Sequence, residues 1–150
     1  MFSDYNKVMN QQRLDKAYMN MAVELATLSY AKKKKVGALI VQGTHIISEG
    51  YNGTPTGFNN NCEYTGDDGH VLTLSQVIHA ESNAITKLAK STQSSMGATL
   101  YCTLSPCFNC AKLIIQAGIS RVVYKEEYKL EENGIHLLEL SGVKVEKSNE

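Results

Sequence analysis

The apolar positions near the start of the chain predict a helix. Between Leu14 and Ala31 they recur at the spacing of one helical face: Ala17, Met21, Leu25 and Leu28, with Tyr18, Ala22 and Ala26 beside them. The preceding segment, from Met1 to Arg13, is mostly polar, so we expect it to be loosely ordered.

Two short apolar runs follow and predict an antiparallel hairpin. The first, Val36 to Val41, is bounded by lysines and Gly43; the second is Ile46 to Tyr51, with a turn at Gln42 to His45 between them. The next segment, Asn52 to Gln76, is rich in glycine, asparagine and aspartate, which indicates a long loop. A loop of this length in a compact domain is usually functional or mobile.

The remaining chain alternates between helical and strand patterns. The expected elements are, in order, helix Val77 to Lys90, strand Thr99 to Thr103, helix Cys107 to Ala117 closed by Gly118, strand Arg121 to Tyr124, helix Leu130 to Ser141 and strand Val143 to Val145. The whole order predicts a single α/β domain over residues 1–150. We expect a three-layer α-β-α sandwich with a mixed five-stranded sheet.

Composition narrows the classes of function. Fifteen basic residues balance fifteen acidic ones, so the chain lacks the basic surplus typical of proteins that track long nucleic acid. The run Lys32 to Lys35 is the one obvious basic patch. Neither a signal peptide nor an apolar run of membrane-spanning length is visible, so we expect a cytoplasmic protein without a membrane partner. In that reducing setting a Cys-x-x-Cys pair is more often metal-binding or redox-active than a disulfide.

Three candidate metal ligands lie at two predicted helix starts. His79 opens one helix, and Cys107 and Cys110 lie three residues apart at the start of another, so the two sulfurs face the same side. Zinc favours nitrogen and sulfur ligands, and a catalytic zinc keeps three protein ligands and one open position. Glu81 follows His79 by two residues, where a carboxylate can exchange protons with water at the metal.

Each half of this pattern is weak by itself. A lone Cys-x-x-Cys pair could be redox-active or half of a zinc ribbon, and a lone histidine is more often an ordinary surface residue. A ribbon needs a second Cys-x-x-Cys pair, which the sequence lacks, and a redox pair does not need His79-Ala80-Glu81. The combined pattern, H-x-E followed by P-C-x-x-C with Pro106 before Cys107, is typical of zinc-dependent nucleobase deaminases.

The sequence resembles the deoxycytidylate (dCMP) deaminases of the cytidine deaminase superfamily, including phage versions. The similarity spans about Leu14 to Val145. It is carried by five stretches: Val36-Gly37-Ala38, Gly50-Tyr51-Asn52-Gly53-Thr54-Pro55-Thr56-Gly57, His79-Ala80-Glu81-Ser82-Asn83-Ala84-Ile85, Ser105-Pro106-Cys107-Phe108-Asn109-Cys110-Ala111-Lys112 and Ile114-Ile115-Gln116-Ala117-Gly118-Ile119. The zinc motif is shared with related deaminases, whereas the Gly-Tyr-Asn-Gly-x-Pro stretch indicates the dCMP branch.

The resemblance implies a cytidine deaminase-like fold and hydrolysis of dCMP to dUMP and ammonia, which supplies dUMP for dTMP synthesis. By resemblance His79, Cys107 and Cys110 would hold Zn²⁺, whose bound water would attack ring carbon 4. Glu81 would carry the proton to the ring nitrogen and then to the leaving amine.

Substrate contacts also follow from the resemblance. The Ala80 N–H would hold the base carbonyl, and the backbone near Ser105 would accept from the exocyclic amine. Asn52 would bind the sugar and Tyr124 would flank the nucleotide. The candidates for the phosphate are three cations that could equally be ordinary surface lysines: Lys34, Lys35 and Lys125.

Many members of this family form hexamers that dCTP with Mg²⁺ activates and dTTP inhibits. If carried over, these properties imply a homo-oligomer, a hexamer, with an effector contact in and beside the glycine-rich loop. The candidates are Gly50, Tyr51, Asn52, Gly53, Gly57 and Asn59, because glycine permits close approach to phosphate. The alternative is a flexible surface loop. Cys62 and His70 could serve a second metal, but a free cysteine and a loop histidine are the favoured interpretation because four ligands are needed.

Two rival functions share the zinc motif. A deaminase of adenosine in transfer RNA would favour a basic face, which the neutral charge argues against. A zinc-stabilised interaction module without catalysis would have no use for Glu81.

Overall fold

A mixed five-stranded sheet forms the centre of the protein, which is described by a computed structural model over residues 2–149. The strand order is β2-β1-β5-β6-β7, in which β1 pairs antiparallel with β2 and β5, while β5–β6 and β6–β7 are parallel. The bounds are β1 Gly37–Gln42, β2 His45–Tyr51, β5 Thr99–Leu104, β6 Arg121–Glu126 and β7 Lys144–Lys147. The predicted mixed sheet is confirmed.

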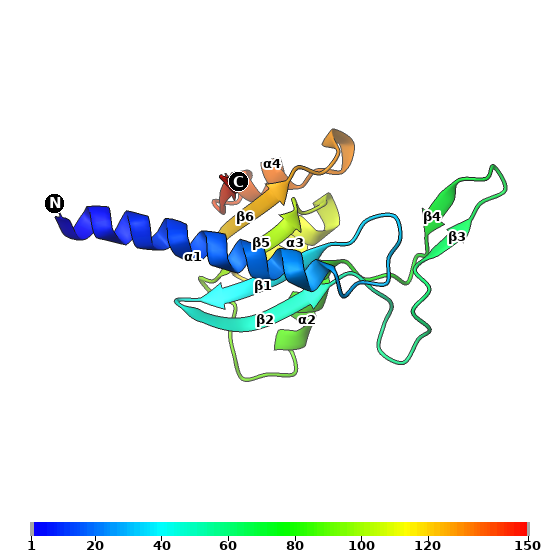
Figure 1. Ribbon diagram of the computed structural model, residues 1–150, viewed down its shortest axis with the longest axis horizontal. Helices are drawn as coiled ribbons and strands as arrows, with labels where there is room; N and C mark the ends of the chain where they lie inside the picture. The colour runs from blue at the N-terminus through cyan, green and yellow to red at the C-terminus, as the bar shows by residue number, and fades with distance from the viewer. Residues whose placement is uncertain (1, 150) are drawn as a thin grey trace.

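Helices cover both faces of this sheet (Figure 1). Helix α1 (Phe2–Ala26) lies on one face, and α2 (Ala80–Leu88), α3 (Phe108–Gln116) and α4 (Ile135–Leu140) lie on the other. Side chains alternate along each strand, as the pleat requires. Leu39, Tyr101 and Val123 pack with α1, whereas their strand neighbours pack beneath the other three helices. The α-β-α layers are therefore confirmed.

Helix α1 differs from its prediction at both ends. It begins at Phe2, so the expectation that the segment up to Arg13 is loosely ordered is wrong for residues 2–13; Met1 lies outside the described residues. Figure 1 shows this half projecting past the sheet. Local hydrogen bonds between residues four apart, such as Gln11 Nε2 to Asp15 Oδ1 at 2.9 Å, sustain a helix without a core.

The buried face of α1 is also rotated from the predicted stripe. Tyr18, Met19 and Ala22 are buried, whereas Met21 and Leu28 are 44% and 55% exposed. The cause is a close approach of the sheet, because a Cβ at Gly37 would lie 2.0 Å from the Ala22 carbonyl oxygen. Small residues on α1 must therefore face β1.

Two other segments depart from prediction. Within the expected loop, β3 (Glu63–Thr65) and β4 (Val71–Thr73) form a short hairpin that extends from the body (Figure 1). The hairpin lacks the alternating apolar pattern because most of its side chains are exposed. The last predicted helix is split into a 3-10 turn, η1 (Leu130–Glu132), and α4, because Gly134 packs against Pro106 and donates its N–H to the Pro106 carbonyl at 2.8 Å.

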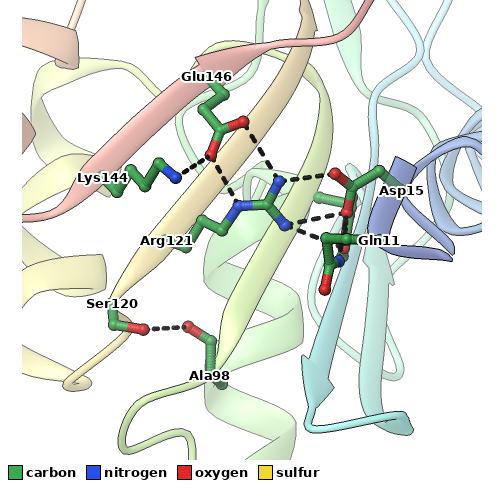
Figure 2. A network of polar contacts seen from close by, with 8 residues as sticks. Gln11, Asp15, Ala98, Ser120, Arg121, Lys144 and Glu146 are labelled. Carbon is green, nitrogen blue, oxygen red and sulfur yellow. Dashed lines mark hydrogen bonds and ion pairs between the residues drawn. The ribbon is translucent and has the colours of Figure 1, made fainter. Parts of the chain in front are cut away.

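A half-buried ionic network joins α1 to the sheet. Figure 2 shows Arg121 between Asp15 and Glu146, and Tyr101 also donates its hydroxyl to Asp15 at 2.6 Å. The Arg121 guanidinium lies 2.6 Å from Asp15 and 2.9 Å from Glu146. Burial alone would raise the pKa of Asp15, but the hydrogen bonds from Arg121, Tyr101 and Gln11 outweigh it and lower the pKa below 3.8.

Replacing Asp15 with asparagine is expected to lower the free energy of unfolding at pH 7 by about 2 kcal/mol, because Arg121 loses its ionic partner. A lowered carboxyl pKa stabilises the fold above the unfolded pKa, and this contribution is lost as the pH falls through the folded value. Urea denaturation should therefore show the difference between the proteins shrinking from pH 7 to pH 3. Glu24→Gln on the same helix is the control, and an equal loss there would contradict the assignment.

None of the helices within residues 2–149 combines the length and hydrophobicity that a membrane crossing requires.

Candidate functional site

Two helix N-termini bring the predicted metal ligands together. His79 and Cys107 are the N-caps of α2 and α3, both with extended backbone angles, and Cys110 lies in the first turn of α3. His79 Nδ1 is 3.3 Å from Cys110 Sγ and 3.4 Å from Cys107 Sγ. The Cys107 sulfur also accepts the Cys110 N–H at 3.4 Å. The three ligand atoms lie within 4.8 Å of one another.

This donor set fits zinc. Tetrahedral zinc with bonds of about 2.0–2.3 Å to nitrogen and sulfur places its ligand atoms about 3.5–3.8 Å apart. A hydrogen bond from Cys110 and the nearby His79 lower the pKa of the Cys107 thiol, while that bond and burial raise the pKa of Cys110. A divalent cation at this point would favour the deprotonated form of both sulfurs and let both bind as thiolates.

Within residues 2–149 this cluster is the one group of three or more side chains suited to a metal. The other candidates, Cys62 and His70, are not brought into such a group. Cys62 is buried beside the Asn60 carbonyl, and His70 is exposed and paired with Asp68 at 2.9 Å. A free cysteine and a loop histidine remain the better interpretation.

Glu81 lies in the first turn of α2, beside the metal cluster and on the wall of the same cavity. It is 4% exposed, and this burial raises the pKa of its carboxyl above the ordinary value. A bound cation would oppose that shift. A buried carboxyl that takes up a proton more readily than a free one is suited to carry protons at neutral pH.

The cavity has a volume of about 580 Å³. It brings together several residues that the sequence predicted as substrate contacts, namely Asn52, Ala80, Ser105 and Lys34. Lys35 and Lys125 are not among the lining residues. Lys34 Nζ lies 2.6 Å from Glu126 at the cavity wall, in an exposed ion pair.

Tyr124, which the resemblance places beside the nucleotide, is not among the residues that line the cavity. It shares the face of β6 with Val122 and packs in the core beneath the helices. The aromatic residue in the cavity is Tyr128, four residues later, which sequence reasoning missed. Its N–H donates to Ser105 Oγ at 2.6 Å, and burial together with Glu132 raises the pKa of its hydroxyl to about 12.

Asn52 and Ser105 line the cavity but are already engaged by the backbone. Asn52 Oδ1 accepts the Val36 N–H at 2.9 Å, and its Nδ2 donates to the Lys34 carbonyl at 2.8 Å. The Ser105 N–H donates to the Glu126 carbonyl at 2.7 Å. A backbone contact from Ser105 to a ligand would therefore have to use its carbonyl.

The residues predicted as effector contacts fall into two groups, those that pack or bond within the fold and those that are exposed. Tyr51 accepts from Asn83 Nδ2 through its carbonyl at 2.8 Å, and Gly53 pairs with Ile78, so both tie the loop to the segment around α2. Gly57 has a φ of +90° and open space beside its Cα, and Asn59 Oδ1 accepts the Asn61 N–H at 2.6 Å. Gly57 and Asn59 are exposed, so this part of the loop is open to a ligand.

Gly50 is a packing position, because a Cβ there would lie 2.4 Å from the Ala80 carbonyl oxygen and 2.7 Å from the Ala84 nitrogen. Gly50→Ala is expected to push α2 away from β2 and to lower the free energy of unfolding by about 2–3 kcal/mol. Thermal denaturation measures this loss, and Gly53→Ala, at a position with open space and no positive φ, is the contrasting variant. Wild-type stability of Gly50→Ala would show that α2 moves at no cost.

The comparisons with known proteins agree with this geometry. The model of the cytidine and deoxycytidylate deaminase zinc-binding region matches residues 12–126. The deoxycytidylate deaminase of Saccharomyces cerevisiae is 36% identical over 136 residues, covering 87% of this chain and 43% of the yeast protein. The deoxycytidylate deaminase of Mycobacterium phage D29 is 33% identical over 129 residues, covering 79% of this chain and 99% of the phage protein.

Among solved structures, the dCMP deaminase from cyanophage S-TIM5 in complex with dCMP and dUMP matches with a TM-score of 0.83 and 45% identity. The match covers 90% of this chain and 96% of that chain. The chain therefore spans less than half the length of its yeast relative and nearly the full length of these two phage proteins.

Proposed function

Because this chain belongs to the cytidine and deoxycytidylate deaminase family, we propose that it hydrolyses dCMP to dUMP and ammonia. The observation that carries the proposal is the meeting of His79, Cys107 and Cys110 with buried Glu81 at one cavity wall. The likeness to phage enzymes named for dCMP supports this substrate. The product would supply dUMP for dTMP synthesis in the cytoplasm, that of the host if the chain is of phage origin.

His79, Cys107 and Cys110 would hold the zinc. When bound, zinc supplies Lewis acidity that brings the pKa of water toward neutrality. Glu81 would take one proton from the attacking water and deliver it to the ring nitrogen. It would then take the second proton, from the hydroxyl now on ring carbon 4, and pass it to the amine, which leaves as ammonia as the carbonyl forms. The burial of Glu81 keeps bulk water from competing for these protons.

The remaining contacts orient the base. Ala80 is the first residue of α2, so its N–H has no partner within the helix and would donate to the base carbonyl. The Ser105 carbonyl would accept from the exocyclic amine. Tyr128 takes the place proposed for an aromatic neighbour of the nucleotide, and Asn52 lies where the sugar would pass.

The phosphate would bind the cations that reach the cavity. Lys34 does so, together with Lys33, whereas Lys35 and Lys125 do not. Lys34 Nζ lies 2.6 Å from the Glu126 carboxylate. A bound phosphate would replace this carboxylate as the ionic partner of Lys34.

We extend the proposal to regulation by dCTP with Mg²⁺ as activator and dTTP as inhibitor, and to a hexamer. The open position at Gly57 supports an effector contact in the loop. The exposed apolar side chains Met21, Leu28 and Ile46, which gather where α1 meets β2, support self-association. Light scattering during size-exclusion chromatography measures the oligomer.

The central test is a deamination assay with dCMP, CMP, deoxycytidine and adenosine-containing RNA. The zinc-loaded protein should be assayed with and without dCTP, dTTP and Mg²⁺. We expect turnover of dCMP and none of the RNA. No turnover of dCMP, even with dCTP and Mg²⁺, would refute the substrate, and unchanged rates with both effectors would refute the regulation alone.

A further inference from the structure

The segment of four lysines, Lys32 to Lys35, lies in the connection between α1 and β1 and is held by a buried carboxylate from a distant part of the chain. We call residues 32–35 the lysine turn. One oxygen of Glu63, Oε2, accepts the Lys32 N–H at 2.8 Å and the Lys33 N–H at 3.2 Å. Glu63 begins β3 and is only 8% exposed.

The far end of the lysine turn is held by the Asn52 amide, which bonds the Lys34 carbonyl and the Val36 N–H. The backbone of the turn is thus bound at both ends, and Lys33 and Lys34 are among the residues that line the cavity. Glu63 itself also lines that cavity.

A buried carboxylate on the wall of a cavity that takes an anion is unfavourable for binding, since it repels the ligand. Burial of the charge also costs free energy unless donors compensate it. The two N–H groups of the lysine turn supply that compensation through charge-assisted hydrogen bonds. Since its charge does not favour anion binding, we infer that the Glu63 carboxylate is there to hold the backbone of the lysine turn in place.

We propose that Glu63 is a positioning residue for phosphate recognition: it fixes the backbone of the lysine turn so that the Lys33 and Lys34 ammonium groups meet the phosphate of the nucleotide. This inference rests on the proposed function. Glu63 differs in this from Glu126, which pairs with the side chain of Lys34 rather than with the backbone of the turn.

The test compares Glu63→Ala with Glu63→Gln, whose amide oxygen can accept the same two N–H groups. The KM and kcat for dCMP are measured together with the inhibition constant of deoxycytidine, which lacks the phosphate. For Glu63→Ala we expect the KM for dCMP to rise about tenfold or more, because a mobile turn no longer presents its cations. The kcat and the deoxycytidine constant should change less than about twofold.

Glu63→Gln should restore the wild-type KM or lower it, since it keeps the acceptor and removes the repulsion. Glu49→Ala, which removes an exposed carboxylate paired with Lys87, is the matched control and should leave all three constants unchanged. If Glu63→Ala does not fold, Glu63→Asp, which keeps the charge but shortens the reach, should raise the KM for dCMP without changing the deoxycytidine constant.

Equal losses for dCMP and deoxycytidine would overturn the inference and indicate a general structural role. So would an unchanged KM for dCMP in Glu63→Ala, or a Glu63→Gln variant as impaired as Glu63→Ala. Each of these outcomes requires a wild-type protein that deaminates dCMP. A wild-type protein without that activity refutes the proposed function itself.

Discussion

Replacing Glu81 with glutamine is expected to lower the turnover number for dCMP by a factor of about 10³ or more, while the protein keeps its zinc. Glutamine has nearly the same size and can still form hydrogen bonds at the cavity wall, but it cannot carry a proton. General acid–base catalysis typically contributes about 10²–10⁴-fold, and here one carboxyl serves several proton transfers. Steady-state kinetics and metal analysis on the same preparation measure the two effects.

Loss of turnover with retention of zinc in Glu81→Gln would distinguish an enzyme from a zinc-stabilised interaction module. Glu81 does not belong to the three-ligand cluster, so its loss should leave the metal in place. Glu139→Gln on α4, an exposed carboxylate outside the cavity lining, is the control and should retain wild-type turnover. Turnover by Glu81→Gln within about tenfold of wild type would exclude the proposed role of Glu81.

Replacing Cys107 with serine is expected to remove both the zinc and the activity. The Cys107 sulfur lies 3.4 Å from His79 Nδ1 and accepts the Cys110 N–H at 3.4 Å, so it is an integral member of the ligand set. Serine is a poor ligand for zinc because its hydroxyl stays protonated. Since even the loss of a residue that only orients a ligand costs about 10–100-fold in metal affinity, we expect more than about a hundredfold here.

Zinc content is measured by atomic emission after dialysis against a weak chelator, and turnover is measured on the same sample. The matched control is Cys102→Ala, which removes a fully buried thiol from β5 that is outside the ligand cluster. That variant should keep its zinc and lose only about 1 kcal/mol of stability. Full zinc binding by Cys107→Ser would show that another residue completes the site.

Three predictions from the sequence differ from the structure, because each depended on a hydrophobic pattern that does not report the interaction responsible. The polar residues before Leu14 gave no indication of a helix, because local hydrogen bonds rather than a core support residues 2–13. The α1 stripe was displaced because the contact at Gly37 selects small residues, and hydrophobicity does not report how closely two backbones approach. The β3–β4 hairpin was missed because its side chains are exposed and carry no periodic pattern.

The sequence by itself determined the five strands of the mixed sheet, the order of the four main helices among them, and the zinc-type ligand set of His79, Cys107 and Cys110. These are local properties, because residue type, periodicity and spacing within one helix start do not depend on distant contacts. Only the tertiary structure decided that Tyr128 rather than Tyr124 reaches the cavity, since the pleat turns Tyr124 into the core. It also decided that Glu63 holds the lysine turn from 30 residues away along the chain, a contact that no local pattern encodes.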